Sequence, residues 1–309
     1  MKGAVGDVGT AVVTGATGFT GRYIARRLLE RGAEVRTLTD HPDREAPFRD
    51  RLAIHPYTFE EPAAMARFMS GAEVFFNTYW VRFSRGETTF RRAVDRSGLL
   101  FRAAREAGVE RIVHVSIANP SEGSPLPYYR GKALVEADLR GLGVSHAILR
   151  PTLVFGREDI LVNNIAWLLR RFPVFLVPGD GAYPVRPVHV DDVAAAALEA
   201  AAGRESRVRD VAGPEVLTFR RLLEAVAAAL GTAARLWRVP PTLAYAAARV
   251  LGRLVDDVVL TRHELEGLRA GLLTVDEARP GGVRFTEWVR EHAGELGRSW
   301  HSELDRHFR

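Results

Sequence analysis

The segment GATGFTG, residues 15–21, decides the fold because it separates two stretches of different periodicity. Residues 10–14 before it have the β-branched pattern of a strand, and residues 20–31 after it have the apolar spacing of a helix that ends at Gly32. A glycine-rich turn between a strand and a helix is typical of dinucleotide-binding proteins, because the helix N-terminus attracts phosphates. The first two glycines stand one residue farther apart than in the common fingerprint, so a plain strand-to-helix turn is the alternative.

Each glycine has a distinct role if the turn binds a dinucleotide. Gly15 permits the tight turn, Gly18 lets a pyrophosphate approach the backbone, and Gly21 lets the helix lie close to the strand. The strand pattern before the turn and the helix pattern after it make cofactor binding the favoured interpretation.

The choice between NAD and NADP depends on the residue after the next strand. Asp40 comes directly after the strand expected at residues 34–39, where a carboxylate accepts both hydroxyls of the adenosine ribose and repels a 2′-phosphate. This position favours NAD. Arg36 and Arg44 flank it and are able to clamp a phosphate, which keeps NADP open.

A second chemical signal is the pair Tyr128 and Lys132, which stand four residues apart and therefore on one face of a helix. A nearby ammonium lowers the pKa of a phenol, which suits Tyr128 to accept or donate a proton beside hydride transfer, and Lys132 is able to bind the nicotinamide ribose. The alternative is chance spacing. Lys132 is the only lysine besides Lys2 in a chain that otherwise uses arginine, and this favours a functional role.

The rest of the first half alternates between strand and helix patterns, which favours parallel strands joined by helical crossovers. We expect strands at residues 34–39, 73–77, 111–116 and 144–150, and helices at 62–70, 88–108 and 128–142. From residue 218 onward the pattern is almost entirely helical, including a helix over residues 286–308. The sequence therefore predicts an α/β protein with a Rossmann-type doubly wound parallel sheet and a smaller, mostly helical C-terminal substrate domain. The expected dinucleotide-binding domain is 1–156 with a return segment at about 185–215, and the smaller domain is 157–184 and 216–309.

Composition restricts the function classes. The chain of 309 residues is 47% hydrophobic, which supports a substantial core, and it has no cysteine for disulfides, thiolate metal sites or nucleophiles. Its 43 basic residues nearly balance 38 acidic ones without a run of five like charges, so we expect no nucleic-acid partner. Residues 1–10 lack the apolar block of a secretory signal, and no stretch is long and uncharged enough to span a membrane. A cytoplasmic location is expected.

Four segments together resemble the extended short-chain dehydrogenase/reductases, which are NAD-dependent epimerase/dehydratase-like proteins. They are the glycine turn, Tyr128 with Lys132, ILRPTLVFG at residues 148–156, and RPVHVDDVA at residues 186–194; the resemblance covers residues 10–215. The spacing of His114-Val115-Ser116, Ser124-Pro125 and Tyr128 is most similar to the atypical branch that includes the reductase-like accessory subunit of respiratory complex I.

The resemblance implies a set of site residues. The pyrophosphate would contact Gly15, Thr17, Gly18, Phe19 and Gly21, and the adenosine ribose would contact Asp40. Asn77 and Thr78 would line the far side of the cofactor, with Lys132, Pro151 and Leu153 beside the nicotinamide end. The catalytic residues would be Tyr128, Lys132 and Ser116, although Ser116 precedes Tyr128 more closely than the catalytic hydroxyl does in many extended members.

The implied activity is that of an NAD(P)-binding oxidoreductase or epimerase, with NAD favoured, which acts on a small carbonyl or alcohol substrate through a Tyr/Lys proton relay. The alternative is a non-catalytic dinucleotide sensor or a structural or assembly protein. The residues expected to approach the small-molecule substrate are Tyr79, Trp80, Arg82, Phe83, Asn163, Asn164 and Trp167. His189, Asp191 and Asp192 are expected to mark a helix start, with one aspartate as its cap, and no metal site is expected.

Overall fold

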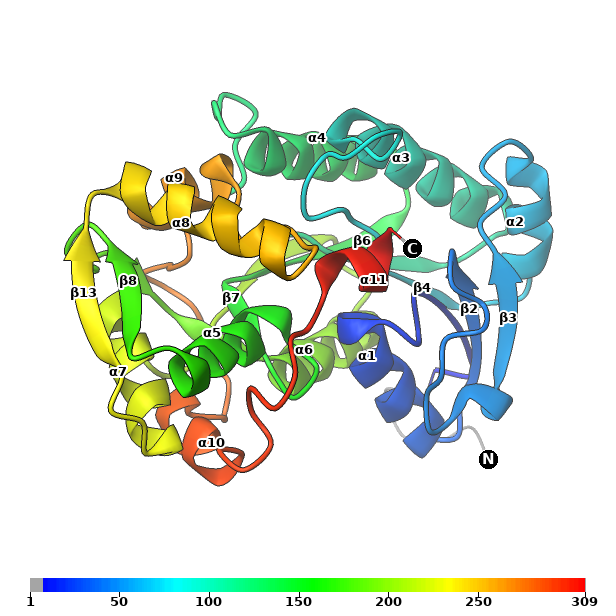
Figure 1. Ribbon diagram of the computed structural model, residues 1–309. Coiled ribbons are helices and arrows are strands. Elements are labelled where there is room, and N and C mark those ends of the chain that lie inside the picture. Colours follow the sequence, from blue (N-terminus) through cyan, green and yellow to red (C-terminus); the bar gives the residue numbers. More distant parts are fainter. Residues whose placement is uncertain (1–7, 309) are drawn as a thin grey trace. The chain divides into compact units, whose positions relative to one another are not determined.

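A parallel sheet forms the centre of the first of two structural units (Figure 1). It has seven strands in the order β11-β6-β5-β4-β1-β2-β3. All neighbouring strands are parallel, which confirms the expected doubly wound sheet. The strands are β1 (Thr10–Thr14), β2 (Glu34–Thr39), β3 (Leu52–Pro56), β4 (Val74–Asn77), β5 (Arg111–Val115), β6 (Ser145–Pro151) and β11 (Arg207–Val211).

Helices cover both faces of this sheet. They are α1 (Phe19–Glu30), α2 (Pro62–Met69), α3 (Phe90–Glu106), α4 (Pro127–Gly141) and α6 (Val190–Ala202). Helix α3 packs between α2 and α4 over a buried cluster that includes Phe75, Phe101 and Ile112, while α1 and α6 pack together on the other face. Strand order reverses at β1, which has β2 on one side and β4 on the other, so the carboxyl ends of β1 and β4 form the switch point where such sheets bind ligands.

The second unit contains short strand pairs and most of the remaining helices. Its strands pair as β7 with β10, β8 with β13, and β9 with β12. Its elements are β7 (Leu153–Phe155), α5 (Ile160–Arg171), β8 (Val174–Pro178), β9 (Pro184–Val185), β10 (Pro187–His189), β12 (Leu217–Thr218), α7 (Phe219–Leu230), β13 (Arg235–Val239), α8 (Pro241–Leu254), α9 (Arg262–Arg269), α10 (Phe285–Glu291) and α11 (Glu303–His307). Its core gathers around Phe155, Leu222 and Trp288.

The chain passes between the two units several times. The computed structural model describes residues 8–308; the first unit runs to Pro151 and resumes at Val190–Val211, and the second holds Thr152–His189 and the chain from Ala212. The boundaries expected from the sequence differ from these by a few residues. Most of residues 1–10, which the signal-peptide argument used, lie outside the described part. None of the helices within residues 8–308 is long and apolar enough to cross a bilayer.

Two expectations about the C-terminal part were wrong. The chain after residue 218 is less helical than its pattern indicates, because Arg235–Val239 forms strand β13 beside β8. The helix expected over residues 286–308 ends at Glu291, and Gly297 has a φ of +68°. A Cβ at Gly297 would lie 2.4 Å from the backbone nitrogen of Trp167, so this glycine turn lets the chain pass close to α5.

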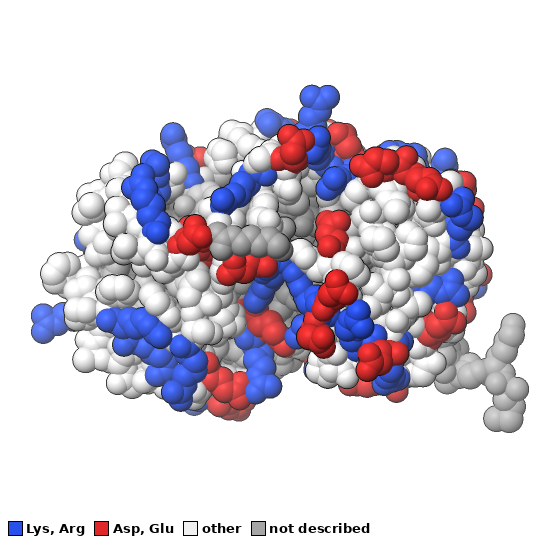
Figure 2. Space-filling view, turned by 45° about the vertical axis from the view of Figure 1, so that its right-hand side comes forward, with Lys and Arg blue, Asp and Glu red and all other residues white. Residues whose placement is uncertain are grey.

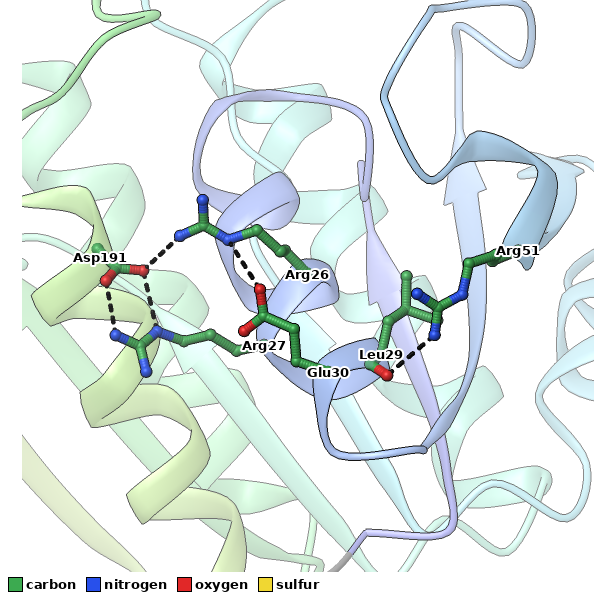
Figure 3. Close-up of polar contacts among 6 residues, drawn as sticks. All are labelled: Arg26, Arg27, Leu29, Glu30, Arg51 and Asp191. Atoms are coloured by element: carbon green, nitrogen blue, oxygen red, sulfur yellow. Dashed lines mark hydrogen bonds and ion pairs between the residues drawn. The ribbon is translucent and has the colours of Figure 1, made fainter.

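The expectation that Asp191 or Asp192 caps a helix was also wrong, because both lie inside the first turn of α6. Helix α6 begins at Val190, so Asp191 lies inside the first turn, where its carboxylate binds α1 (Figure 3). Arg27 donates from Nε at 2.9 Å and from Nη2 at 2.6 Å, and Arg26 donates at 2.9 Å. Burial acts to raise the pKa of Asp191, but its hydrogen bond and charge interaction with Arg27, assisted by Arg26, hold it below the usual value.

Surface charge is mixed in sign. On the face drawn in Figure 2, acidic and basic side chains lie interspersed around larger uncharged areas. Many of the arginines on the described surface are paired with carboxylates, as Arg209 is with Glu199 and Arg262 is with Glu266.

Candidate functional site

The glycine turn between β1 and α1 has the geometry of a phosphate cradle. Gly15 has a φ of +60° and donates its N–H to the carbonyl of Leu38 at 2.8 Å, while the N–H of Gly18 donates to the Gly15 carbonyl at 2.8 Å. A Cβ at Gly21 would lie 2.2 Å from the Gly15 carbonyl oxygen. Only glycine allows this close approach of α1 to the end of β1.

Several polar groups in this turn have no hydrogen-bond partner in the described protein and are therefore able to bind a ligand. Gly18 is the N-cap of α1 and provides no capping side chain, so the first-turn N–H groups of a twelve-residue helix point out of the turn. Thr17 is buried, and its hydroxyl has no partner within residues 8–308. Phe19 begins the helix, with its ring edge-on to Tyr23. These observations fit a bound pyrophosphate.

An arginine lies beside the cradle. The Nη1 atom of Arg44 is 3.9 Å from the position that a Cβ on Gly18 would take. Arg36 behaves differently from the expectation, because its guanidinium binds Glu34 and the carbonyls of Phe68 and Ser70. Of the two arginines that flank Asp40 in the sequence, Arg44 is therefore the one shown to lie beside the cradle.

Asp40 follows β2 and faces a cluster of aromatic residues. Partial desolvation raises the pKa of its carboxyl, and the positive charge of Arg96 opposes this rise. The rings of Tyr57 and Phe59 stack at 5.0 Å, and Tyr79 meets them at 5.3 and 5.8 Å. The guanidinium carbon of Arg96 lies 4.5 Å from the centre of the Phe59 ring. Aromatic faces beside the carboxylate that is expected to bind the ribose would suit an adenine base.

Sequence reasoning missed Arg96. It stands on α3, far along the chain from Asp40, and no motif links the two positions. Burial also raises the pKa of Tyr79, while a hydrogen bond and the charge of Arg96 act in the opposite direction. Arg96 therefore lies against the aromatic cluster, and its charge also acts on Asp40.

Asn77 and Thr78 hold the ends of β1 and β4 together. The Thr78 N–H donates to the Thr14 hydroxyl at 2.6 Å, and the Thr78 hydroxyl donates to the Thr14 carbonyl at 2.7 Å. Asn77 is fully buried; its amide oxygen accepts from the N–H of Tyr79 at 3.1 Å, and its amide nitrogen lies 3.2 Å from Nδ1 of His114. Asn77 therefore fixes the conformation of the strand ends through buried hydrogen bonds.

Tyr128 and Lys132 both contact Trp80. The ring of Tyr128 meets the edges of Trp80 and Phe90, each at a centroid distance of 5.9 Å. The Nζ atom of Lys132 lies 4.7 Å from the centre of the Trp80 ring and donates to the carbonyl of Val115 at 2.9 Å. Trp80 therefore links the two residues that the helical spacing put on one face.

Lys132 is almost fully buried, with 3% of its surface exposed. Burial lowers its pKa from 10.5 to about 7, although the charge of Glu136 acts to raise it. Burial, and then the charge of Lys132, also lower the pKa of His114 well below 6.5, so this imidazole is neutral near pH 7. Two buried nitrogens in this region, Nε1 of Trp80 and Nε2 of His114, have no partner within the described residues.

The hydroxyl of Ser116 is engaged in a different network. It donates to Glu136 at 2.6 Å, and the same carboxylate accepts from Arg140 and Arg150 at 2.6 Å each. Glu136 is fully buried, so Ser116 helps to satisfy an interior charge. The expectation that Ser116 supplies the catalytic hydroxyl does not agree with this orientation.

The remaining expected positions belong to different units. In the first unit, the carbonyl of Pro151 accepts from the N–H of Ala118 at 2.9 Å. In the second, Leu153 packs against the core. Asn163 binds the carbonyls of Arg157 and Asp159, and Asn164 exchanges two hydrogen bonds with the backbone of His301. Both amides, which were expected to approach substrate, are therefore used to hold the backbone of their own unit.

Side chains of the other expected substrate contacts also pack locally. Arg82 lies over the ring of Phe83 at 5.7 Å, and Trp167 contacts Trp300 at 5.2 Å. Within residues 8–308 no group of three or more His, Asp or Glu side chains is arranged to hold a metal ion.

Comparison with known proteins gives consistent matches. The profile of the NAD dependent epimerase/dehydratase family matches residues 11–211. The mitochondrial NADH dehydrogenase [ubiquinone] 1 alpha subcomplex subunit 9 of Arabidopsis thaliana is 28% identical over 225 residues, which are 69% of this chain and 56% of that protein. A ceramide reductase of Caulobacter vibrioides is 33% identical over 190 residues, 60% of this chain and 59% of that protein. The chain thus spans less than two thirds of the length of these relatives.

The fold has solved counterparts as well. The NADPH-dependent quinone oxidoreductase of Escherichia coli, solved with NADPH, superimposes with a TM-score of 0.72 at 22% identity, covering 91% of this chain and 99% of that one. This likeness is one of fold.

Proposed function

Because the chain belongs to the NAD dependent epimerase/dehydratase family and has NAD(P) as its cofactor, we propose that it is an oxidoreductase or epimerase acting on a small carbonyl or alcohol substrate. The observation that carries this proposal is the contact of both Tyr128 and Lys132 with Trp80, beside the strand-end network of Asn77 and His114. A protein that only binds dinucleotide has no need of an acid/base tyrosine.

The residues proposed to hold the cofactor lie in the glycine turn and at the ends of the neighbouring strands. The cradle of Gly15, Thr17, Gly18, Phe19 and Gly21 would bind the pyrophosphate, assisted by Arg44. Asp40 would accept the hydroxyls of the adenosine ribose, which favours NAD, and the aromatic cluster would contact the adenine. Thr78 is proposed to line the far side of the cofactor, and Lys132 and Pro151 its nicotinamide end, as the family resemblance implies.

The chemistry divides between cofactor and protein. When bound, the nicotinamide exchanges a hydride with the carbon of the substrate. Tyr128 takes the proton from the substrate hydroxyl in the oxidative direction and returns it to the carbonyl oxygen in reduction. Lys132 acts through position and charge: it stands one helical turn after Tyr128 on α4, and with a pKa of about 7 it changes charge in the range where the proton moves.

Turnover and binding are measured separately to test this proposal. NAD(P)H oxidation is followed with ketone derivatives of ceramides, with quinones and with simple ketones, and dinucleotide affinity is measured by calorimetry. Tyr128→Phe keeps the ring but removes the ionisable hydroxyl, so it should lower kcat at least about a hundredfold while leaving the dinucleotide Kd nearly unchanged. Lys132→Ala should impair both. Tyr129→Phe, which removes the neighbouring hydroxyl on the same helix, is the control and should keep most of the activity.

A second function, binding of dinucleotide without catalysis, is favoured by two contacts. Lys132 donates to Val115 beneath Trp80, and Ser116 donates to Glu136, so neither group reaches outward. Tight dinucleotide binding together with no turnover on the whole panel, or full activity of Tyr128→Phe on a true substrate, would replace the enzymatic proposal with this one.

A further inference from the structure

Large apolar side chains are exposed along one continuous segment, formed by β13 and α8. Of the nine exposed large hydrophobic residues in the described chain, four lie here: Trp237 is 54% exposed, Leu243 51%, Val250 55% and Leu254 78%. The others are dispersed over the rest of the chain. Single exposed apolar residues need no explanation, but a concentration within one short segment indicates an interaction surface.

Helical spacing gathers three of these residues into a stripe. Leu243, Val250 and Leu254 are seven and four residues apart, so they lie on one face of α8. The buried residues of the same helix, Ala244 and Gly252, belong to the face that packs on the protein. Helix α8 is thus amphipathic with an additional apolar stripe that faces solvent.

The charges of the segment have one sign. Residues 235–254 contain Arg235, Arg238, Arg249 and Arg253 and no acidic residue; the next acid, Asp256, follows the end of α8. All four arginines are exposed, and none of their guanidinium groups has a hydrogen-bond or ion-pair partner among residues 8–308. Arg249 and Arg253 are four residues apart and form a row beside the apolar stripe.

We propose that β13 and α8 dock the protein on an anionic phospholipid surface. The apolar stripe and Trp237 would enter the boundary between headgroups and acyl chains, and the arginines would bind lipid phosphates, as a basic amphipathic helix does when it lies in the plane of a membrane. A second copy of this chain fits the segment poorly, because a symmetric contact would bring two sets of unpaired arginines together.

The test is co-sedimentation of the full chain with vesicles of phosphatidylcholine alone and of phosphatidylcholine mixed with phosphatidylglycerol. We expect binding to the mixed vesicles only, and weaker binding at high salt. Val250→Asp combined with Leu254→Asp should abolish it, while Arg249→Gln and Arg253→Gln should each weaken it about fivefold. Val216→Asp and Arg221→Gln change an exposed valine and an exposed arginine elsewhere in the same unit, and should bind like the parent.

Because all substituted side chains are exposed, the variants should fold, and circular dichroism and thermal melting check this. Trp237 provides a second measurement: lipid should shift the emission of the parent to shorter wavelength, and Trp237→Phe should lose that shift. No binding to anionic vesicles, or equal binding of the Val250→Asp/Leu254→Asp variant, overturns the proposal. A dimer in light scattering that the same variant dissociates would show instead that a second copy covers this surface.

Discussion

Among single residues, Lys132 should make stability depend on pH. Its pKa is about 7 in the folded protein and near 10.5 when exposed, so between these values the unfolded chain binds more protons and the free energy of unfolding rises with pH. Lys132→Met should flatten this rise and, at pH 7 and below, raise stability by at most roughly 5 kcal/mol. Urea unfolding of parent and variant across this pH range measures both effects. An unchanged slope in the variant would contradict the buried-lysine assignment.

Substitutions of two glycines in the phosphate cradle should have different effects, one on dinucleotide binding alone and the other also on stability. A Cβ at Gly18 would lie 3.1 Å from the Gly15 carbonyl oxygen, a contact that a small shift relieves, whereas at Gly21 the distance is 2.2 Å. Gly18→Val should therefore fold and lose more than about tenfold in dinucleotide affinity, while Gly21→Ala should also lose stability.

Gly141→Ala is the matched control for these two variants, because nothing lies within 4 Å of the added methyl. Calorimetric titration and thermal melting compare the three proteins. Normal dinucleotide binding by Gly18→Val would show that this turn is not the cofactor site.

Residue spacing predicted local relationships in the site but not its long-range contacts. The four-residue interval placed Tyr128 and Lys132 on one face, and both contact Trp80. The direction of Lys132 depends on the carbonyl of Val115, and that of Ser116 on Glu136, partners that lie on other elements. No periodicity encodes which distant acceptor a flexible side chain will reach.

Helices α1 and α6 are joined by the ion pairs of Asp191 with Arg26 and Arg27. Removing the charge of Asp191 should therefore lower stability. Asp191→Asn should lower the free energy of unfolding by about 1 kcal/mol, because these side chains are 28% to 44% exposed and solvent screens them. The lowered pKa of Asp191 means that its contribution is present at neutral pH and is lost as pH falls through that pKa.

Urea unfolding at low and high salt measures this contribution, and Asp43→Asn, which alters a fully open carboxylate, is the control. An effect of Asp191→Asn that persists unchanged at high salt would argue against an ionic contact.

Elements were predictable where burial was uniform. Strands β1, β4 and β5 are buried along almost their whole length and were expected within a residue or two. Edge strand β3 is only partly buried and ends at Pro56, so its pattern gave no signal. Strand β13 has two arginines separated by two apolar residues just before Pro240, so it shows no strand alternation. Its pairing with β8 is a tertiary contact that overrides local preference.

For the whole molecule, dinucleotide binding should raise the melting temperature, and the size of the rise should differ between NAD and NADP. A dinucleotide at about a hundred times its Kd adds roughly 2.7 kcal/mol, which corresponds to about 4 °C for a chain of this length. At equal concentration NAD should raise the Tm more than NADP, and Asp40→Ala should narrow the difference. Differential scanning fluorimetry measures both shifts, with Gly18→Val as the control without a shift. A larger shift with NADP in the parent would reverse the proposed preference.

The chain leaves its first unit at Pro151 and returns to it at Val190, and this path delays the completion of the sheet while the chain is being synthesised. Strand β6 ends at Pro151, but it receives its outer neighbour β11 only when the chain has been made as far as Val211. At translation rates of roughly 5 to 20 residues per second, the nascent sheet exposes an unpaired parallel edge for about 3 to 12 seconds. For about the first two thirds of that interval α1 also lacks the partner that Asp191 provides. Such an edge is able to recruit strands from neighbouring chains, so the length of the intervening segment determines how long each new molecule is exposed to aggregation.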